Sequence, residues 1–232
     1  MKSKMHVTML LAAPWAGVLI PTPATRAAIV PYTETFTSDS ANWFNGPGVA
    51  PVGWTATGGP DGSAFATTTA NFAASQPNAP AVLFRGQDEF NSSNGAFVGN
   101  WVSSGITAFS ADVRHDAGVP LNFFVRFASP ANFPGANNVF FIPVSSGTWT
   151  TLSTALPNPS LIFEGPFTYD QVFSNIGHVQ VGVSTPTALA GVDASFDFDL
   201  DNVSIVPEPA TLALLLLGGM FTMRRWRGDE RP

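Results

Sequence analysis

Short runs of alternating apolar and polar residues dominate the middle of the chain. Residues 109–114 read Phe-Ser-Ala-Asp-Val-Arg, and residues 179–184 read Val-Gln-Val-Gly-Val-Ser. A period of two is typical of a strand with one buried side and one solvent-facing side. Gly, Pro, Asn and Ser separate the runs, and no repeat of 20 to 50 residues is visible. The pattern predicts an all-β fold built from antiparallel sheets.

The strand pattern occurs in ten segments: 52–57, 64–69, 81–85, 97–102, 106–114, 121–128, 139–144, 148–153, 177–184 and 194–206. Only residues 169–175 favour a helix, of about two turns. The chain holds 20 Phe and only 2 Tyr. This composition predicts a dry core in which Phe side chains fill the space between two sheets.

The last strand contains an irregularity in its alternation. Phe198 and Leu200 alternate with aspartates, but the apolar phase then moves to Val203 and Ile205. A strand with a period of two cannot change face without an extra residue. We therefore expect a β-bulge near residues 201–202, which would redirect an aspartate side chain.

The first 27 residues read as a secretory signal peptide. Lys2 and Lys4 precede an apolar run over residues 7–20, and prolines and small residues follow it. A run of 14 residues is too short to cross the ~30 Å hydrocarbon core comfortably. Cleavage after Ala27 fits the small-residue rule, and cleavage after Ala24 is a second choice.

The last 26 residues, 207–232, form a three-part tail. The motif Pro207-Glu208-Pro209 comes first, an apolar run over residues 210–223 follows, and residues 224–232 form a basic end. The basic end includes Arg224, Arg225 and Arg227. As a helix, the apolar run would be ~21 Å long, which predicts a short transmembrane anchor. The arginines would stay on the cytoplasmic side, so the body would face outwards.

This tail resembles the PEP-CTERM sorting domain. The resemblance implies a Gram-negative host that makes exopolysaccharide, with export by the secretion machinery and a transient inner-membrane intermediate. It also implies recognition by an exosortase, which removes the tail, so that the protein reaches the cell surface or the extracellular matrix. It assigns no activity to the body of the chain.

The body, residues 28–206, suits one domain with a sizeable core. It holds three arginines, no lysine and thirteen acidic residues, a net charge of −10 against −6 for the whole chain. Such a surface repels a phosphate backbone and argues against nucleic-acid binding. The absence of Cys excludes a disulfide framework and a Cys-based metal site.

The two ends of the body carry a second resemblance. Residues 32–36 (Tyr-Thr-Glu-Thr-Phe), Trp43 and Gly53-Trp54 lie near its start, and residues 198–203 (Phe-Asp-Leu-Asp-Asn-Val) lie near its end. They resemble extracellular jelly-roll domains of the galactose-binding-like and carbohydrate-binding-module type. The resemblance implies a jelly-roll β-sandwich of two antiparallel sheets whose first and last strands are neighbours.

The same resemblance implies a structural calcium ion beside the paired end strands. Its ligands would be an early carboxylate, Glu34, and a last-strand aspartate, Asp201, with Asn202 or Asp39 as helpers. Oxygen ligands on an irregular backbone suit Ca²⁺. The alternative is that Glu34 and Asp201 are ordinary surface carboxylates on strand edges.

Sugar binding requires exposed aromatic platforms together with polar side chains. The candidate platforms are Trp43, Trp54, Trp101, Trp149, Tyr32 and Tyr169. Core packing is the competing interpretation for each Trp, and the sequence does not identify the residues that bind a ligand.

The sequence offers little for catalysis. His115 and His178 are far apart, and the serine-hydrolase, zinc-protease and phosphate-loop motifs are absent. His178 opens a strand pattern and is expected at the surface. We expect a secreted, non-catalytic, exosortase-processed protein. The alternatives are a carbohydrate-binding module with a structural calcium and a weak polysaccharide hydrolase, which would need two facing carboxylates ~5 to 10 Å apart.

Overall fold

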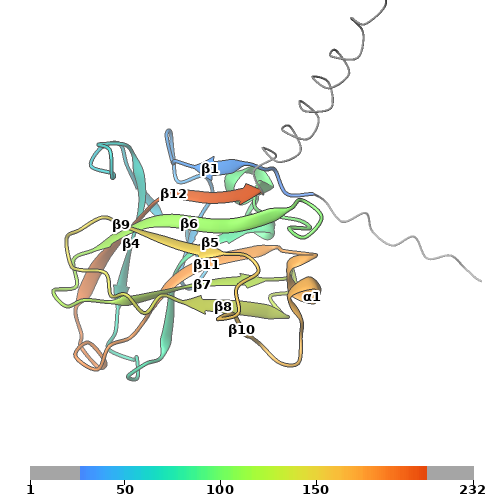
Figure 1. Cartoon of the computed structure of the whole chain (residues 1–232). Helices are drawn as coiled ribbons and strands as arrows, with labels where there is room; N and C mark the ends of the chain where they lie inside the picture. Colours follow the sequence, from blue (N-terminus) through green and yellow to red (C-terminus); the bar gives the residue numbers. More distant parts are fainter. Residues whose placement is uncertain (1–26, 208–232) are drawn as a thin grey trace, which may run out of the picture.

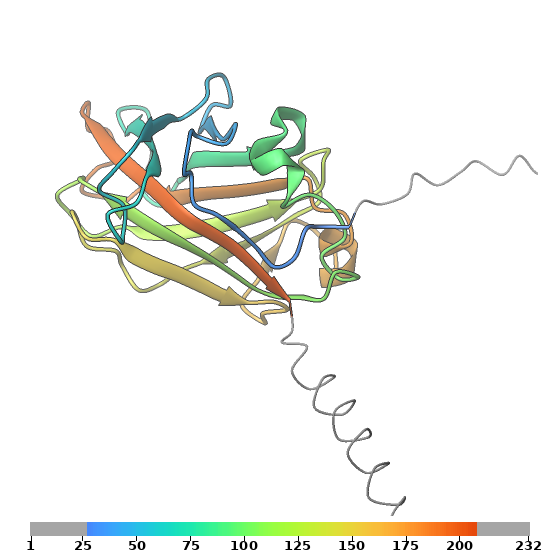
Figure 2. The same cartoon turned by 90° about the horizontal axis from the view of Figure 1, so that it is seen from above.

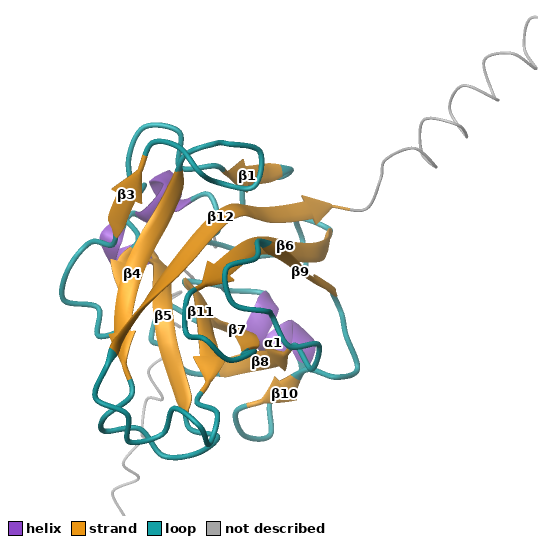
Figure 3. Ribbon diagram, turned by 90° about the vertical axis from the view of Figure 1, so that its left-hand side faces the viewer, coloured by secondary structure: helices purple, strands orange, loops and turns teal. Residues whose placement is uncertain are grey.

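The computed structural model describes residues 27–207, which form a sandwich of two antiparallel sheets (Figures 1 and 3). Sheet A has the order β3 (Gly53–Thr55), β4 (Phe65–Asn71), β12 (Ser195–Pro207), β6 (Ile106–His115) and β9 (Thr150–Ala155), and β1 (Tyr32–Glu34) also pairs with β12. Sheet B has the order β10 (Ile162–Phe163), β8 (Gly135–Val139), β7 (Asn122–Ala128), β11 (His178–Ser184), β5 (Pro80–Gln87) and β2 (Phe44–Asn45). The predicted jelly-roll sandwich is confirmed, and the first and last strands are neighbours.

The helical segments are few and short. Helix α1 spans Tyr169–Phe173, inside the predicted helix, and 3₁₀ turns span Asp88–Phe90 and Ser92–Gly95. Thr168 begins α1 with a capping box, in which its side chain and that of Gln171 satisfy each other's backbone N–H groups. Within residues 27–207 no helix is long and apolar enough to cross a membrane.

Two strand predictions are wrong. Residues 97–102 form turns, because Gly99 adopts a φ of 130° and the Trp101 indole folds back to donate to the Phe97 carbonyl at 2.8 Å. The predicted strand at 139–144 lies too far along the chain, since β8 ends at Val139. The alternation of β8 is hidden in the sequence because Asn138 occupies an inward position, opposite the core residue Val125, and is buried.

The core lies between the sheets and is rich in phenylalanine, as predicted. The fully buried aromatic side chains are Trp43, Trp101, Phe36, Phe72, Phe84, Phe109, Phe123, Phe127, Phe173 and Phe198. The Trp43 ring packs on β5 at Gly86, where an added Cβ would lie 2.7 Å from the ring. Trp43 and Trp101 are therefore core residues and cannot serve as sugar platforms.

The long strand β12, orange-red in Figure 2, contains the predicted bulge. Asp201 pairs with Asp112 of β6, but Ser204 pairs with Ser110, so β12 has one extra residue at this point. Asn202 adopts a φ of 49°, and its side chain donates to the Asp112 carboxylate at 2.8 Å. The bulge allows Leu200 and Val203 to be buried in the same core.

The bulge also marks a change of partner along one edge of β12. Before it, residues 195–200 pair with β4, and after it, residues 203–205 pair with β1. On the other edge β6 follows β12 almost throughout. The bulge therefore separates two strands that share one edge of the central strand.

The signal peptide and the sorting tail predicted from the sequence fall almost entirely outside the described residues. Of the sorting motif only Pro207 is described, as the last residue of β12 opposite Ile106. Glu208, Pro209, Arg224, Arg225 and Arg227 lie beyond it.

A buried histidine is built into the end of β6. His115 is 1% exposed, and its Nε2 lies 3.0 Å from the Val144 carbonyl oxygen. The backbone N–H of Ala117 donates to Nδ1 at 3.2 Å, which suits the neutral ring with its hydrogen on Nε2. Burial lowers the pKa of His115 below its usual value, against a smaller opposing effect of the Val144 carbonyl.

We predict that substitutions at Asn202 destabilise the protein according to how well the new residue accepts the positive φ of the bulge. Asn202→Val should lower the free energy of unfolding by about 2 kcal/mol, because a β-branched residue is strained at this φ and the bond to Asp112 is lost. Asn202→Gly should cost less, about 1 kcal/mol, since glycine accepts the conformation. Urea denaturation of both variants measures the difference, and equal losses would contradict the account.

We also predict that His115 makes the fold less stable in acid. Because its folded pKa lies below its unfolded value of ~6.5, the unfolded chain binds the extra proton first. Stability should fall as the pH drops below ~6.5 toward the folded pKa. His115→Gln should show a smaller slope of unfolding free energy against pH between 7 and 5. Identical slopes in the two proteins would show that His115 does not contribute to the loss of stability in acid.

Candidate functional site

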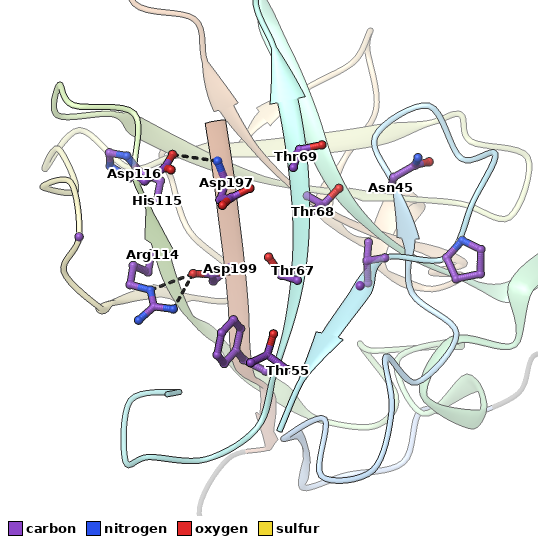
Figure 4. Close-up of a pocket in the computed structure, with 15 residues that line it drawn as sticks. Asn45, Thr55, Thr67, Thr68, Thr69, Arg114, His115, Asp116, Asp197 and Asp199 are labelled. Carbon is purple, nitrogen blue, oxygen red and sulfur yellow. Dashed lines mark hydrogen bonds and ion pairs between the residues drawn. The ribbon is translucent and has the colours of Figure 1, made fainter. Parts of the chain in front are cut away.

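A groove of about 760 Å³ lies on the outer face of sheet A (Figure 4). We call it the sheet A groove, and β3, β4, β12 and β6 contribute to its lining. The two-residue period places its polar side chains together. Asp197 and Asp199 of β12 lie opposite Thr69 and Thr67 of β4, and Asp199 also lies opposite Arg114 of β6.

Arg114 organises one end of the sheet A groove. Its Nε and Nη2 both lie 2.8 Å from Asp199 Oδ2, and its Nη1 donates to the Gly58 carbonyl at 3.2 Å. The guanidinium carbon lies 5.1 Å from the centre of the Phe65 ring and 4.7 Å from that of Trp149. The cation is therefore held by a carboxylate and two aromatic rings.

Trp149 is half-buried and packs against Phe65 and Arg114, two of the residues that line the groove. Its indole N–H donates to the Gly58 carbonyl at 3.0 Å, and its ring meets Phe65 edge-on at 5.5 Å. These contacts fix the ring while leaving part of it in solvent. Of the candidate platforms, Trp149 is the one that contacts the groove's own residues.

The side chains of the other candidate platforms make their contacts outside the groove, although Trp54 lies between Gly53 and Thr55, which line it. Trp54 is 39% exposed, and its indole donates to the Phe36 carbonyl. Tyr32 packs on Phe97, and Tyr169 stacks on Phe173 of α1.

The far end of the groove carries two exposed carboxylates (Figure 4). Asp116 Oδ1 accepts the backbone N–H of Asp197 at 2.8 Å, and the Asp116 N–H donates to the Asp197 carbonyl at 3.2 Å. Within residues 27–207 the carboxylate of Asp197 has no hydrogen-bond partner of its own. The groove thus combines threonine hydroxyls with carboxylate oxygens that are free to accept hydrogen bonds.

The outer face of sheet B holds a second polar cluster, but its groups satisfy one another. Arg126 donates to Glu164 through Nε at 2.5 Å and through Nη2 at 2.7 Å. Its remaining N–H groups bond Asn132 and Gln180. The hydrogen bond from Arg126 lowers the pKa of the Glu164 carboxyl below its usual value.

His178 belongs to this sheet B cluster, and its predicted surface position is wrong. The ring is 3% exposed, with Nδ1 2.8 Å from the Gln87 amide and Nε2 3.0 Å from the Pro130 carbonyl. Burial lowers its pKa, against a smaller opposing effect of the Pro130 carbonyl. The loop at Pro130 covers the ring, which the alternation along β11 does not reveal. We interpret the cluster as a structural network.

The two candidate calcium ligands lie on opposite faces of sheet A. Glu34 pairs with the buried Val203 and so shares its inner face, whereas Asp201 pairs with Asp112 on the outer face. Asp201 Oδ2 accepts from Ser63 at 2.8 Å, and Oδ1 accepts the N–H of the next residue. Burial raises the pKa of the Asp201 carboxyl above its usual value, against the smaller effect of that Ser63 bond.

Glu34 instead lines a small polar pocket of about 270 Å³ together with Asp39. Its carboxylate accepts the Tyr32 hydroxyl at 2.9 Å and the Phe36 N–H at 3.0 Å. Asp39 accepts the N–H of Ala41, while the other proposed helper, Asn202, lies at the bulge. The described part of the chain has no group of three or more His or acidic side chains placed to hold a metal. Calcium binding remains a prediction, with Glu34 and Asp39 as the ligands that lie together.

Sequence reasoning did not select the groove residues. The sequence shows Asp197 and Asp199 at the polar positions of the last predicted strand, and Arg114 at a polar position of the predicted strand 106–114. That the two strands are neighbours follows only from the topology. These residues could have been grouped only by recognising that their side chains point outward from two strands that pair with each other.

No protein-family model matches the chain, and no curated protein matches it in sequence. Several solved structures are similar in fold. The CBM22-1 and GH10 modules of endo-1,4-β-D-xylanase 10B from Clostridium thermocellum, complexed with xylohexaose, match 78% of this chain and 29% of theirs, at 16% identity and a TM-score of 0.48. The CBM22-1 xylan-binding domain from Paenibacillus barcinonensis matches 78% of this chain and 97% of its own, at 14% identity and a TM-score of 0.42. The family 11 carbohydrate-binding module from Clostridium thermocellum, in complex with a β-1,3-1,4-mixed-linked tetrasaccharide, matches 78% and 98% at 14% identity and a TM-score of 0.44. At these identities the function has to be argued from the groove itself.

Proposed function

We propose that the body of this protein is a non-catalytic polysaccharide-binding module and that the sheet A groove is its binding site. The observation that carries the proposal is that solvent-exposed polar side chains lie near an aromatic ring that is held in place by its neighbours. Asp197 and Thr69 are exposed in the groove, and the half-buried Trp149 packs against Phe65 and Arg114, two of the residues that line it. Its volume of about 760 Å³ lies in the range typical of ligand sites, ~300 to 1,000 Å³.

The chemistry of the groove suits a ligand rich in hydroxyl groups. Carboxylate oxygens accept hydrogen bonds from hydroxyls, and threonine hydroxyls both donate and accept. An aromatic ring adds apolar contact area that a sugar ring can cover. Trp149 is preorganised by Gly58, Phe65 and Arg114, so little conformational freedom would be lost on binding.

Polysaccharide hydrolysis is the competing function, because two aspartates in the groove have a spacing that a glycosidase could use. Asp197 and Asp199 are two residues apart on one face of β12, about 7 Å along the strand, which is a separation that glycosidases use. Asp199, however, is engaged on one oxygen by two N–H groups of Arg114. Asp199 is therefore already occupied by a structural ion pair, which favours binding over catalysis.

The proposal includes the terminal segments and the calcium ion. The signal peptide and the PEP-CTERM-like tail support export, exosortase processing and display at the cell surface or in the exopolysaccharide matrix. Calcium would have a structural role beside Glu34 and Asp39, whose oxygen atoms suit that ion.

We predict that purified protein binds a neutral polysaccharide and that Trp149→Ala weakens this binding at least about tenfold, because an aromatic contact with a sugar ring is removed. Isothermal titration calorimetry against xylan, mixed-linkage glucan, agar and cellulose oligosaccharides measures it, with calcium and again with a chelator. Loss of affinity in the chelator would support a structural calcium.

Trp54→Ala is the matched control, since Trp54 is a partly exposed tryptophan whose side chain lies on the other face of β3 from the groove residues Gly53 and Thr55. It should bind as well as the original protein. Absence of binding to any polysaccharide by folded protein, or release of reducing sugar on incubation, would refute a non-catalytic binding module.

We predict that deleting residues 207–232 changes the destination of the protein in its host. Without the tail the protein should be secreted unprocessed, because both the anchor and the exosortase motif are gone. Cell fractionation with immunoblotting measures the destination. Deleting only residues 228–232 is the control, and this chain should still be processed. An unchanged destination after the full deletion would contradict the sorting role.

A further inference from the structure

The sheet A groove is acidic, although it contains an arginine. Its lining includes three carboxylates and one guanidinium. Arg114 is paired with Asp199, which leaves Asp116 and Asp197 uncompensated. His115 adds no charge near neutral pH, because burial lowers its pKa. The groove therefore carries a net charge of about −2 in the part that faces solvent.

The described body supplies no unpaired cation to the groove. It contains three arginines and no lysine. Arg126 is paired with Glu164, whereas Arg85 donates through Nε to the Gly46 carbonyl and forms no ion pair within the described residues. Both arginines lie on sheet B, and neither lines the groove. An acidic polysaccharide would therefore meet like charge in the groove, where Arg114 is already paired with Asp199.

The two free carboxylates are held side by side. The backbone bonds between Asp116 and Asp197 fix the loop after β6 against β12, so both side chains stay at the same end of the groove (Figure 4). Both residues are exposed. A positively charged ligand would need to displace only water from them, and would gain two charge-assisted hydrogen bonds.

We propose that the sheet A groove selects polysaccharides that carry free amino groups, such as polymers of glucosamine. This inference rests on the proposed glycan-binding function and specifies the ligand class of the same site. Asp116 and Asp197 bind the ammonium groups, the threonine hydroxyls bind sugar hydroxyls, and Trp149 covers one sugar ring.

The test compares four hexasaccharides on the purified full-length protein by isothermal titration calorimetry at 20 mM salt. They are the glucosamine hexamer, its fully N-acetylated counterpart, xylohexaose and a hexamer of uronic acid. The glucosamine hexamer should bind about tenfold more tightly than its N-acetylated counterpart. This ratio should shrink toward one at 0.5 M salt, because exposed ion pairs are screened.

Asp197→Asn and Asp116→Asn should each reduce the ratio, and the double variant should bring it close to one. Both changes keep an oxygen that accepts hydrogen bonds, so the backbone contact at Asp116 is preserved. Asp170→Asn, on α1 and away from the groove, is the control and should leave the ratio unchanged.

The outcomes separate this inference from the proposed function. Equal affinity for the free and N-acetylated hexamers would overturn the amine preference and leave a neutral-glycan module standing. Tighter binding of the uronic acid hexamer, with or without calcium, would also overturn it. Failure of all four sugars to bind would overturn the ligand class at this site, and failure of these four sugars together with the wider polysaccharide panel would overturn the proposed function itself.

Discussion

The pairing of β12 is the interaction on which the rest of the structure depends. This strand of 13 residues lies in the middle of sheet A, with β6 on one edge and β4 and then β1 on the other. It buries Phe198 and Leu200 before its bulge and Val203 and Ile205 after it. Without the extra residue, one of these two pairs would face solvent.

The same strand creates the candidate site. While its apolar residues fill the core, the alternating Asp197 and Asp199 must point outward, beside Thr69 and Thr67 of β4. The inner face of β12 therefore contributes to the core, and its outer face contributes the aspartates of the groove. Asp199 is neutralised by Arg114, while Asp197 stays open to solvent.

Scarcity of positive charge shapes both outer faces of the sandwich. On sheet B, Arg126 forms an ion pair with Glu164, and the hydrogen-bonding groups of this structural network satisfy one another. On sheet A, Arg114 forms an ion pair with Asp199 and contacts two aromatic rings. With its arginine already paired, the sheet A groove presents carboxylates and hydroxyls to its surroundings, which suits a neutral or cationic ligand.

Local pattern predicted much of this fold, because alternation and the phase jump on the last strand are properties of one strand at a time. The bulge at Asn202 was anticipated in this way, whereas the pairing of the end strands was implied by the resemblance to jelly-roll domains. The groove was not anticipated, since it requires knowing that β4, β12 and β6 are adjacent. The turns at residues 97–102 were also missed, because a run of apolar residues around Gly99 looks the same whether it is a strand or a buried turn. His178 was missed because a loop from elsewhere in the sequence covers it.

The most direct test of the central claim is a crystal structure of the protein with a bound oligosaccharide. The account predicts sugar density in the sheet A groove, with one ring against Trp149 and hydrogen bonds to Asp116 or Asp197. Density on the outer face of sheet B, in contact with Arg126 and Gln180, would contradict it and would make the cluster assigned here to structure the true binding site.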